Sequence, residues 1–371
     1  MRACKGFGSP GVSCGMLVMG HKIGGCGVTW DHVNGTAVAD AGGIPEIACD
    51  ESGSDGENLT GGNTDVFAHA SVLLPADSAA GHLREIRNRI RSPAEEYKAN
   101  HLLREKHRTV LEWLLSASGP LYGHAHVHLV EKSFFVVDRA ADLLLGDPGA
   151  ALPLFRQGRR TFTETEWRQF LEAANQLLWV RHAGSPDAPV ERFFRTVEEL
   201  RLRYPGTAAA ETLSRLSEER SRALAYRAGI QDGPFVLTPV LNPLLPSILH
   251  TAAHWSAGGR PVRLAHDRQN MLTPQRIAWI EGAARLRGIR LAGLRLVVSR
   301  LDARVQLADF LAGIARRIAS DELNGRGDPA LTALLRPYTG EAAVWGDERS
   351  WARLGPAGES GGRSAQLNSP V

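Results

Sequence analysis

The sequence has little cysteine and no cysteine pairs. Three of its four cysteines (Cys4, Cys14 and Cys26) lie in the first 26 residues, ten and twelve positions apart, without a Cys-x-x-Cys pair. This spacing argues against a zinc site there. Cys49 lies in an apolar segment, where a free cysteine normally acts as a small buried hydrophobe. Nothing in this pattern indicates an oxidising compartment.

Long apolar runs are also absent. No stretch of about 18 uninterrupted apolar residues occurs, so we expect no membrane span. The first twenty residues lack a charged segment followed by an apolar one, because glycine, serine and proline interrupt residues 6–11. We therefore expect an intracellular, cytoplasmic protein without a membrane partner.

The charge balance is mild. The net charge is +3 and 22% of the residues are charged, which neither requires nor excludes a nucleic-acid partner. The 371 residues, 43% of them hydrophobic, suffice for one large domain or two ordinary ones with a sizeable core. Oligomeric state is not indicated by these quantities.

The two ends of the chain differ from its centre. Residues 1–43 are glycine-rich without a sustained period, and we expect a disordered leader or an extension upstream of the true start. Residues 355–371 have the Gly/Ser/Pro composition of a disordered tail. We assign residues 44–325 to one domain that carries a helical insertion at about 150–235.

Strand and helix patterns alternate through the centre. Apolar runs at 44–49 and 65–74 are joined by a turn-rich segment, which predicts a pair of antiparallel strands. Residues 162–229 have a sustained helical period. The other predicted strands are 124–137, 261–266 and 294–299, and the other predicted helices are 78–90, 95–115, 246–257, 274–287 and 305–320.

Two carboxylates follow the first predicted strand. Period-two alternation places Cys49 and Asp50 on opposite faces of the sheet, with Glu51 next in line. If Cys49 packs in the core, the Asp50 side chain has to meet water, a cation or a hydrogen-bond donor. A solvent-exposed turn is the alternative, since acidic residues and glycine are common in turns.

The predicted helix at 305–320 carries a second acidic position. Leu307, Phe310, Leu311, Ile314 and Ile318 form one apolar stripe, and another face carries Gln306, Asp309 and Gly313. A glycine inside a helix costs about 1 kcal/mol relative to alanine, so Gly313 indicates a close approach by another group. Asp309 would need a cation or an arginine as partner if it is buried.

Three histidines provide a competing set of metal ligands. Alternation puts His124, His126 and His128 on one face of a strand. Side chains at such positions rarely converge on a single zinc ion, so we interpret them as a half-exposed sheet face. Asp138, after the apolar residues 134–137, is an alternative fifth acidic residue of the site, although a role as N-cap of the helix that follows requires no metal chemistry.

The motifs together resemble a known family. IACDESG, the strand DVFAHASVLL, EYK and VVSRLDARVQLADFLAGIARR are similar to the domain-of-unknown-function 3800 family, whose pattern is an opening DESG strand, a central E-x-K and a closing Q-x-A-D helix. The resemblance covers residues 44–318 and implies an α/β, ribonuclease H-like fold, with a mixed β-sheet flanked by helices. It also implies metal-dependent phosphodiester chemistry.

The resemblance also implies a set of site residues. Asp267 is added by its position after the strand PVRLAH. The candidate catalytic residues are Asp50, Glu51, Glu96, Lys98, Asp267, Gln306 and Asp309. Of these, the expected metal ligands are Asp50, Glu96, Asp267 and Asp309. Hard carboxylate oxygens favour Mg²⁺ or Mn²⁺ over zinc.

These residues predict a metal-dependent nuclease or phosphodiesterase with nucleic acid, DNA or RNA, as partner. Two alternatives are a non-catalytic nucleic-acid or protein interaction module, and a hydrolase of small phosphate esters. Lys98 either contacts a phosphate or the attacking water, or pairs with a neighbouring glutamate. Arg316 either contacts a phosphate backbone or lies on a solvated helix face.

Overall fold

The computed structural model describes residues 43–91, 98–180, 187–230 and 238–356. The predicted leader and tail therefore lie outside the described residues, apart from residues 43, 355 and 356. None of the described helices combines the length and apolar composition needed to cross a membrane.

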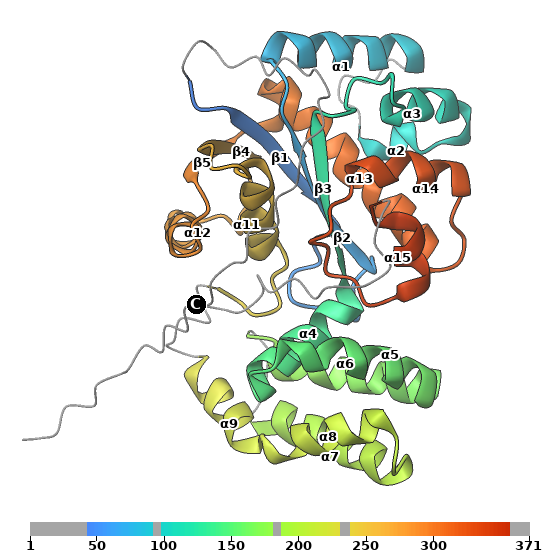
Figure 1. Cartoon of the computed structure of the whole chain (residues 1–371), viewed down its shortest axis with the longest axis vertical. Helices are drawn as coiled ribbons and strands as arrows, with labels where there is room; N and C mark the ends of the chain where they lie inside the picture. Colours follow the sequence, from blue (N-terminus) through green and yellow to red (C-terminus); the bar gives the residue numbers. More distant parts are fainter. Residues whose placement is uncertain (1–42, 92–97, 181–186, 231–237, 357–371) are drawn as a thin grey trace, which may run out of the picture. The chain divides into compact units, whose positions relative to one another are not determined.

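A mixed sheet forms the centre of the described structure (Figure 1). Its five strands have the order β3-β2-β1-β4-β5, with β1 in the middle. β1 pairs antiparallel with β2, β2 pairs antiparallel with β3, and β1, β4 and β5 run parallel. The predicted antiparallel pair and α/β class are confirmed. The strands are β1 (Glu46–Ser52), β2 (Val66–Val72), β3 (Ala125–Glu131), β4 (Val262–Asp267) and β5 (Leu291–Val297).

Helices cover both faces of the sheet. On one face α13 packs on β1 and β2, and on the other α11 packs on β2, β3 and β4 (Figure 1). The helices on the α13 side are α1 (Ala76–Ile90), α2 (Ala99–Leu102), α3 (Arg108–Leu115), α13 (Ala303–Leu323), α14 (Pro329–Leu335) and α15 (Glu348–Leu354). On the opposite side lie α11 (Leu244–Trp255) and α12 (Pro274–Leu286).

The alternation of β1 separates these two faces. Cys49 is fully buried toward α11, and the predicted apolar stripe of α13 is buried against the other face. The core on the α13 side continues beyond residue 325, because Leu335, Tyr338 and Leu354 pack within it.

A run of helices separates β3 from α11. No strand occurs among the described residues 132–230, so the predicted helical character of this segment is confirmed, although its first helix begins at Lys132 rather than near residue 150. Its helices are α4 (Lys132–Leu145), α5 (Ala151–Thr161), α6 (Glu164–Leu178), α7 (Asp187–Arg203), α8 (Ala208–Glu218) and α9 (Arg220–Gly229).

Three local predictions differ from the structure. The strand predicted at 124–137 ends at Glu131, and the apolar residues 134–137 are helical because each of them is buried in the core that α4 shares with neighbouring helices. Asp138 lies inside α4 and pairs with Arg139 at 2.6 Å, so it is not a helix cap. The helix predicted at 95–115 is divided into α2, a 3₁₀ turn and α3.

Helix α13 runs along β1 in the same direction. At one end Arg304 Nη2 lies 3.0 Å from Glu46 Oε2, and at the other Arg316 Nε donates to Ser52 Oγ at 3.0 Å. Twelve helical residues rise about 18 Å and six strand residues about 20 Å, so the two elements stay in step. This match places Asp309 beside the middle of β1.

Candidate metal site

Asp50 lies at the centre of the site. It is on the α13 face of β1, 7% exposed, and its Oδ1 accepts a hydrogen bond from the backbone N–H of Glu51 at 2.8 Å. Burial raises the pKa of the Asp50 carboxyl to about 9, and the charges of Glu51, Asp309 and Asp267 add to this effect. Asp50 therefore favours its neutral form unless a positive charge lies nearby.

Glu51 points toward the opposite face. Its Oε2 is buried without a hydrogen-bond partner among the described residues, and lies 3.5 Å from Nε2 of His266. Burial, followed by the charge of Asp267, raises the pKa of Glu51 to about 7. A buried carboxyl oxygen without a donor is costly, so this atom is available to a cation or a water molecule.

Asp267 ends the neighbouring parallel strand β4. Its Oδ1 accepts hydrogen bonds from the backbone N–H groups of Arg268 at 2.8 Å and Ser299 at 3.0 Å. The side-chain amide of Gln306 donates to the carbonyl of Ser299 at 3.0 Å. Gln306 thus fixes the turn that orients Asp267, which is a positioning role.

Asp309 and Lys98 form the outer part of the site. Lys98 Nζ lies 3.8 Å from Asp309 Oδ2, and α2 begins directly after Lys98. The close approach predicted at Gly313 is made by α2, because a Cβ on Gly313 would lie 2.4 Å from the Cβ of Ala99. Gly313 therefore lets α2 approach α13 closely enough for Lys98 to reach Asp309.

The structure brings four of the predicted acids into electrostatic contact. The charges of Asp267 and Asp309 raise the pKa values of both Asp50 and Glu51. The fifth, Glu96, lies outside the described residues. Within the described ranges, however, no three His, Cys, Asp or Glu side chains are arranged to hold a metal ion.

These side chains carry the oxygen ligands that a hard divalent cation prefers. Their present spacing, however, does not form a coordination site. Carboxylate oxygens are the ligands that Mg²⁺ and Mn²⁺ prefer, and buried carboxyl groups that repel one another favour a cation between them. The described residues do not form a ready-made coordination cage. To hold a cation, Asp50, Asp267 and Asp309 would have to draw closer together than they lie here.

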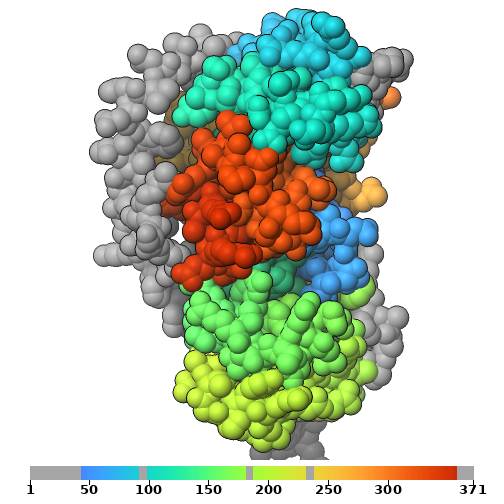
Figure 2. Space-filling view, turned by 90° about the vertical axis from the view of Figure 1, so that its right-hand side faces the viewer, coloured from blue at the N-terminus to red at the C-terminus, as the bar shows by residue number. Residues whose placement is uncertain are grey.

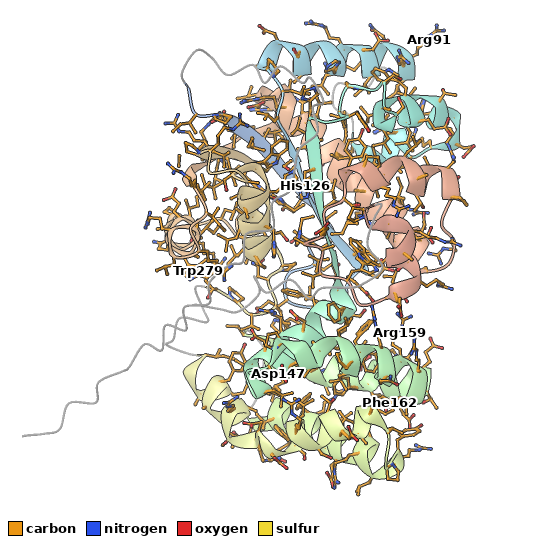
Figure 3. All side chains as sticks on the ribbon, in the orientation of Figure 1. Arg91, His126, Asp147, Arg159, Phe162 and Trp279 are labelled. Atoms are coloured by element: carbon orange, nitrogen blue, oxygen red, sulfur yellow. The ribbon has the colours of Figure 1, made fainter. Side chains whose placement is uncertain are left out.

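A layer of histidines lies on the other face of the sheet. His126, labelled in Figure 3, stacks on His254 with ring centroids 3.8 Å apart, and His128 stacks on His250 at 4.5 Å. The prediction of a half-exposed face was wrong for His126 and His128, which are buried beneath α11. Nearly parallel rings cannot direct their lone pairs at one ion, so this geometry gives no support to the zinc alternative.

The layer extends to the strand end that carries Glu51. His69 stacks on His266 at 5.3 Å, and its Nδ1 lies 2.8 Å from the hydroxyl of Thr251. Our sequence reasoning did not include His69, His250, His254 or His266. The spacing of His250 and His254, four residues apart on one helix, was the signal for a shared face.

Comparisons with family models, with curated proteins and with solved structures found no match for this chain. The resemblance to the domain-of-unknown-function 3800 family therefore rests on the short motifs around Asp50, Lys98 and Asp309.

Proposed function

We propose that this protein is a metal-dependent nuclease or related phosphodiesterase with a ribonuclease H-like fold. The observation that carries the proposal is the environment of Asp50, a buried carboxyl on the central strand whose pKa is raised to about 9 by burial and by three further carboxyl groups. Strongly perturbed ionisable groups that share one site are typical of functional centres.

The sheet topology supports the same proposal. The resemblance implies a mixed sheet flanked by helices, and β1 lies between an antiparallel hairpin and two parallel strands. Asp50 lies near the carboxyl end of β1 and Asp267 ends the neighbouring parallel strand β4, so both are near the same edge of the sheet. This edge is where α/β proteins commonly bind ligands.

Hydrolysis of a phosphodiester requires an activated water molecule and neutralisation of charge at the phosphate, and a bound Mg²⁺ or Mn²⁺ supplies both. The chain itself contributes the carboxylates and a cationic group. The side chain of Lys98 is 60% exposed beside Asp309, so its ammonium group can contact a substrate phosphate. Glu51 is the candidate proton acceptor: burial raises its pKa to about 7, and its carboxyl lies near His266 on the α11 side of the strand that carries Asp50.

The test is a hydrolysis assay with DNA, RNA and a small phosphodiester in parallel, in Mn²⁺, in Mg²⁺ and in EDTA. We expect metal-dependent cleavage of nucleic acid, and a loss of at least about a hundredfold in Asp50→Asn. Asp187→Asn, which changes an exposed acid of α7, is the matched control. Equal rates in both variants would contradict the proposal. Metal-dependent cleavage of the small phosphodiester alone would contradict the nuclease and leave a phosphodiesterase.

A second candidate function is a non-catalytic nucleic-acid or protein interaction module on the same fold. It is favoured because no three His, Cys, Asp or Glu side chains of the described residues are arranged to hold a metal ion. Binding of nucleic acid without cleavage in any metal would support this candidate over the enzyme.

A further inference from the structure

A cavity lined by arginines lies against α13, the helix that also carries Asp309. It occupies about 350 Å³ between α2, α3, α13 and α14. Figure 2 shows the teal residues of α2 and α3 adjoining the orange-red residues of α13 and α14. Three acidic side chains line it, against five arginines, which leaves a net charge of two positive. The arginines are Arg104, Arg108, Arg316, Arg317 and Arg326.

Arg316 connects this cavity to the end of β1. It lines the cavity and also donates from Nε to the hydroxyl of Ser52, two residues after Asp50. A Cβ on Gly53, which has φ +90°, would lie 2.4 Å from the carbonyl oxygen of Val66 and 2.8 Å from Cδ of Arg316. The glycine of the DESG motif therefore leaves room for the Arg316 side chain, whose guanidinium makes no ion pair with any described residue.

The remaining arginines are held in place to different degrees. Arg108 is fixed by Asp328 at 2.6 Å and by Glu112 at 2.6 Å. Arg104 is exposed and has no ion-pair partner within the described ranges. Arg104 and Arg316 thus retain most of their hydrogen-bonding capacity for a ligand, and a guanidinium group matches phosphate oxygens with two parallel donors.

We propose that this cavity binds the phosphodiester backbone of a nucleic-acid strand, on one side of the bond presented to Asp50. The inference rests on the proposed function and names the substrate class of that site. Asp309 and Arg316 are seven residues apart on α13, which corresponds to about 10 Å along the helix. A polymer spans both the carboxylates and the cavity, whereas a free phosphate occupies only one of them.

The test measures binding of a labelled single-stranded oligonucleotide by fluorescence anisotropy, in EDTA and over a range of salt concentrations. In the double variant Arg104→Gln/Arg316→Gln we expect Kd to rise at least tenfold. The slope of log K against log salt should decrease in magnitude by about 1.4, or about 0.7 for each lost phosphate contact. In the single variant Arg104→Gln the slope should decrease in magnitude by about 0.7, which is half of the change in the double variant. Arg104 is exposed, so this variant should fold like the wild type.

The matched control is Arg168→Gln/Arg195→Gln, which removes two exposed arginines from the helical insertion. If the control weakens binding as much as the cavity variant, or if neither variant weakens it, the inference is overturned. Displacement of the oligonucleotide by inorganic phosphate at an equal concentration of phosphate groups would also overturn it, because the site would then be one for free phosphate.

Hydrolysis measured on the same variants separates this inference from the proposed function. Tight binding that depends on Arg104 and Arg316, without cleavage by the wild type, supports the cavity and contradicts the nuclease. Metal-dependent cleavage with Kd and kcat/KM unchanged in the double variant supports the nuclease and contradicts the cavity.

Discussion

The two faces of the central sheet carry opposite kinds of ionisable groups. On the α13 face, burial raises the pKa of Asp50 to about 9, and on the α11 face it lowers the pKa of His266 to about 4 and those of His126 and His128 well below 6.5. Burial therefore favours the neutral form of Asp50 on one face and of these histidines on the other. The difference lies in the surroundings. Lys98 and Arg316 lie near the acids of the α13 face, whereas on the α11 face the imidazoles stack in pairs and His266 lies 3.5 Å from the buried carboxyl of Glu51.

The two faces should respond to pH in opposite directions. The pKa of Asp50 is higher in the folded protein than its ordinary value of 3.8, so without a cation the free energy of unfolding decreases as pH rises from about 4 toward 9. The histidine pKa values are lower than the ordinary 6.5, so stability is present above about pH 6.5 and is lost as pH falls toward 4. On the α13 face a bound cation would offset the repulsion between the carboxylates. On the α11 face burial disfavours protonation of the histidines.

The largest expected effect is acid sensitivity of the histidine face. Between about pH 6.5 and pH 5, each buried histidine that stays neutral should lower the free energy of unfolding by up to about 1.4 kcal/mol per pH unit. His128→Leu should remove one such contribution and flatten the pH dependence, as measured by urea unfolding at several pH values. His124→Leu, outside the buried layer, is the control and should retain the wild-type slope.

An unchanged slope in His128→Leu would show that its ring is protonated in the folded protein. The two faces would then not differ in the way that burial implies.

Metal binding should distinguish the carboxylate face. Mg²⁺ or Mn²⁺ at a hundredfold excess over Kd should stabilise the wild type by about 2.7 kcal/mol, as measured by calorimetry. Asp50→Asn and Asp309→Asn should each remove most of this gain, and the double variant little more, because both residues act on one site. His128→Leu and Asp187→Asn should keep the full gain.

The same Asp50→Asn variant should be more stable than the wild type in EDTA at neutral pH, since it removes a buried carboxyl that other carboxyls repel. Metal stabilisation that persists in both single variants would show that Asp50 and Asp309 do not share a cation.

A smaller effect is expected where α2 meets α13. Gly313→Ala should destabilise the protein by about 1–2 kcal/mol, because overpacking against Ala99 outweighs the gain in helix propensity of about 1 kcal/mol. Gly282→Ala in α12 is the matched control, since its Cβ would meet only the end of the Arg285 side chain at 3.9 Å. The temperature of thermal unfolding should therefore decrease in Gly313→Ala and increase in Gly282→Ala. An increase in Gly313→Ala would show that α2 moves to make room for the added methyl group.

The smallest effect concerns the turn that orients Asp267. Gln306→Ala removes the hydrogen bond to the carbonyl of Ser299 and should lower the free energy of unfolding by about 1 kcal/mol. A positioning role also predicts weaker metal affinity, measured by titration calorimetry. A variant with normal metal affinity and only reduced stability would assign Gln306 a purely structural role.

Much of the local structure followed from the sequence. Period-two alternation correctly separated Cys49 from Asp50, and the helical period correctly identified the buried stripe of α13 and the helical insertion. Residues 134–137 were mistaken for strand because β-branched and aromatic residues favour strands, whereas burial on all sides in the core stabilises them as a helix.

The site was predictable only in its parts. Motifs indicated Asp50, Lys98, Asp267 and Asp309 one by one, but the electrostatic contact between Asp50 and Asp309 arises because α13 runs in step with β1.

The sequence by itself determined which side chains share a face of each element, because that depends on the period of the backbone. Only the tertiary structure decided which elements cover each face. It stacked His250 and His254 of α11 on His128 and His126 of β3, and it brought Arg316 to Ser52. These contacts join segments more than 100 residues apart, and no local period specifies such a pairing.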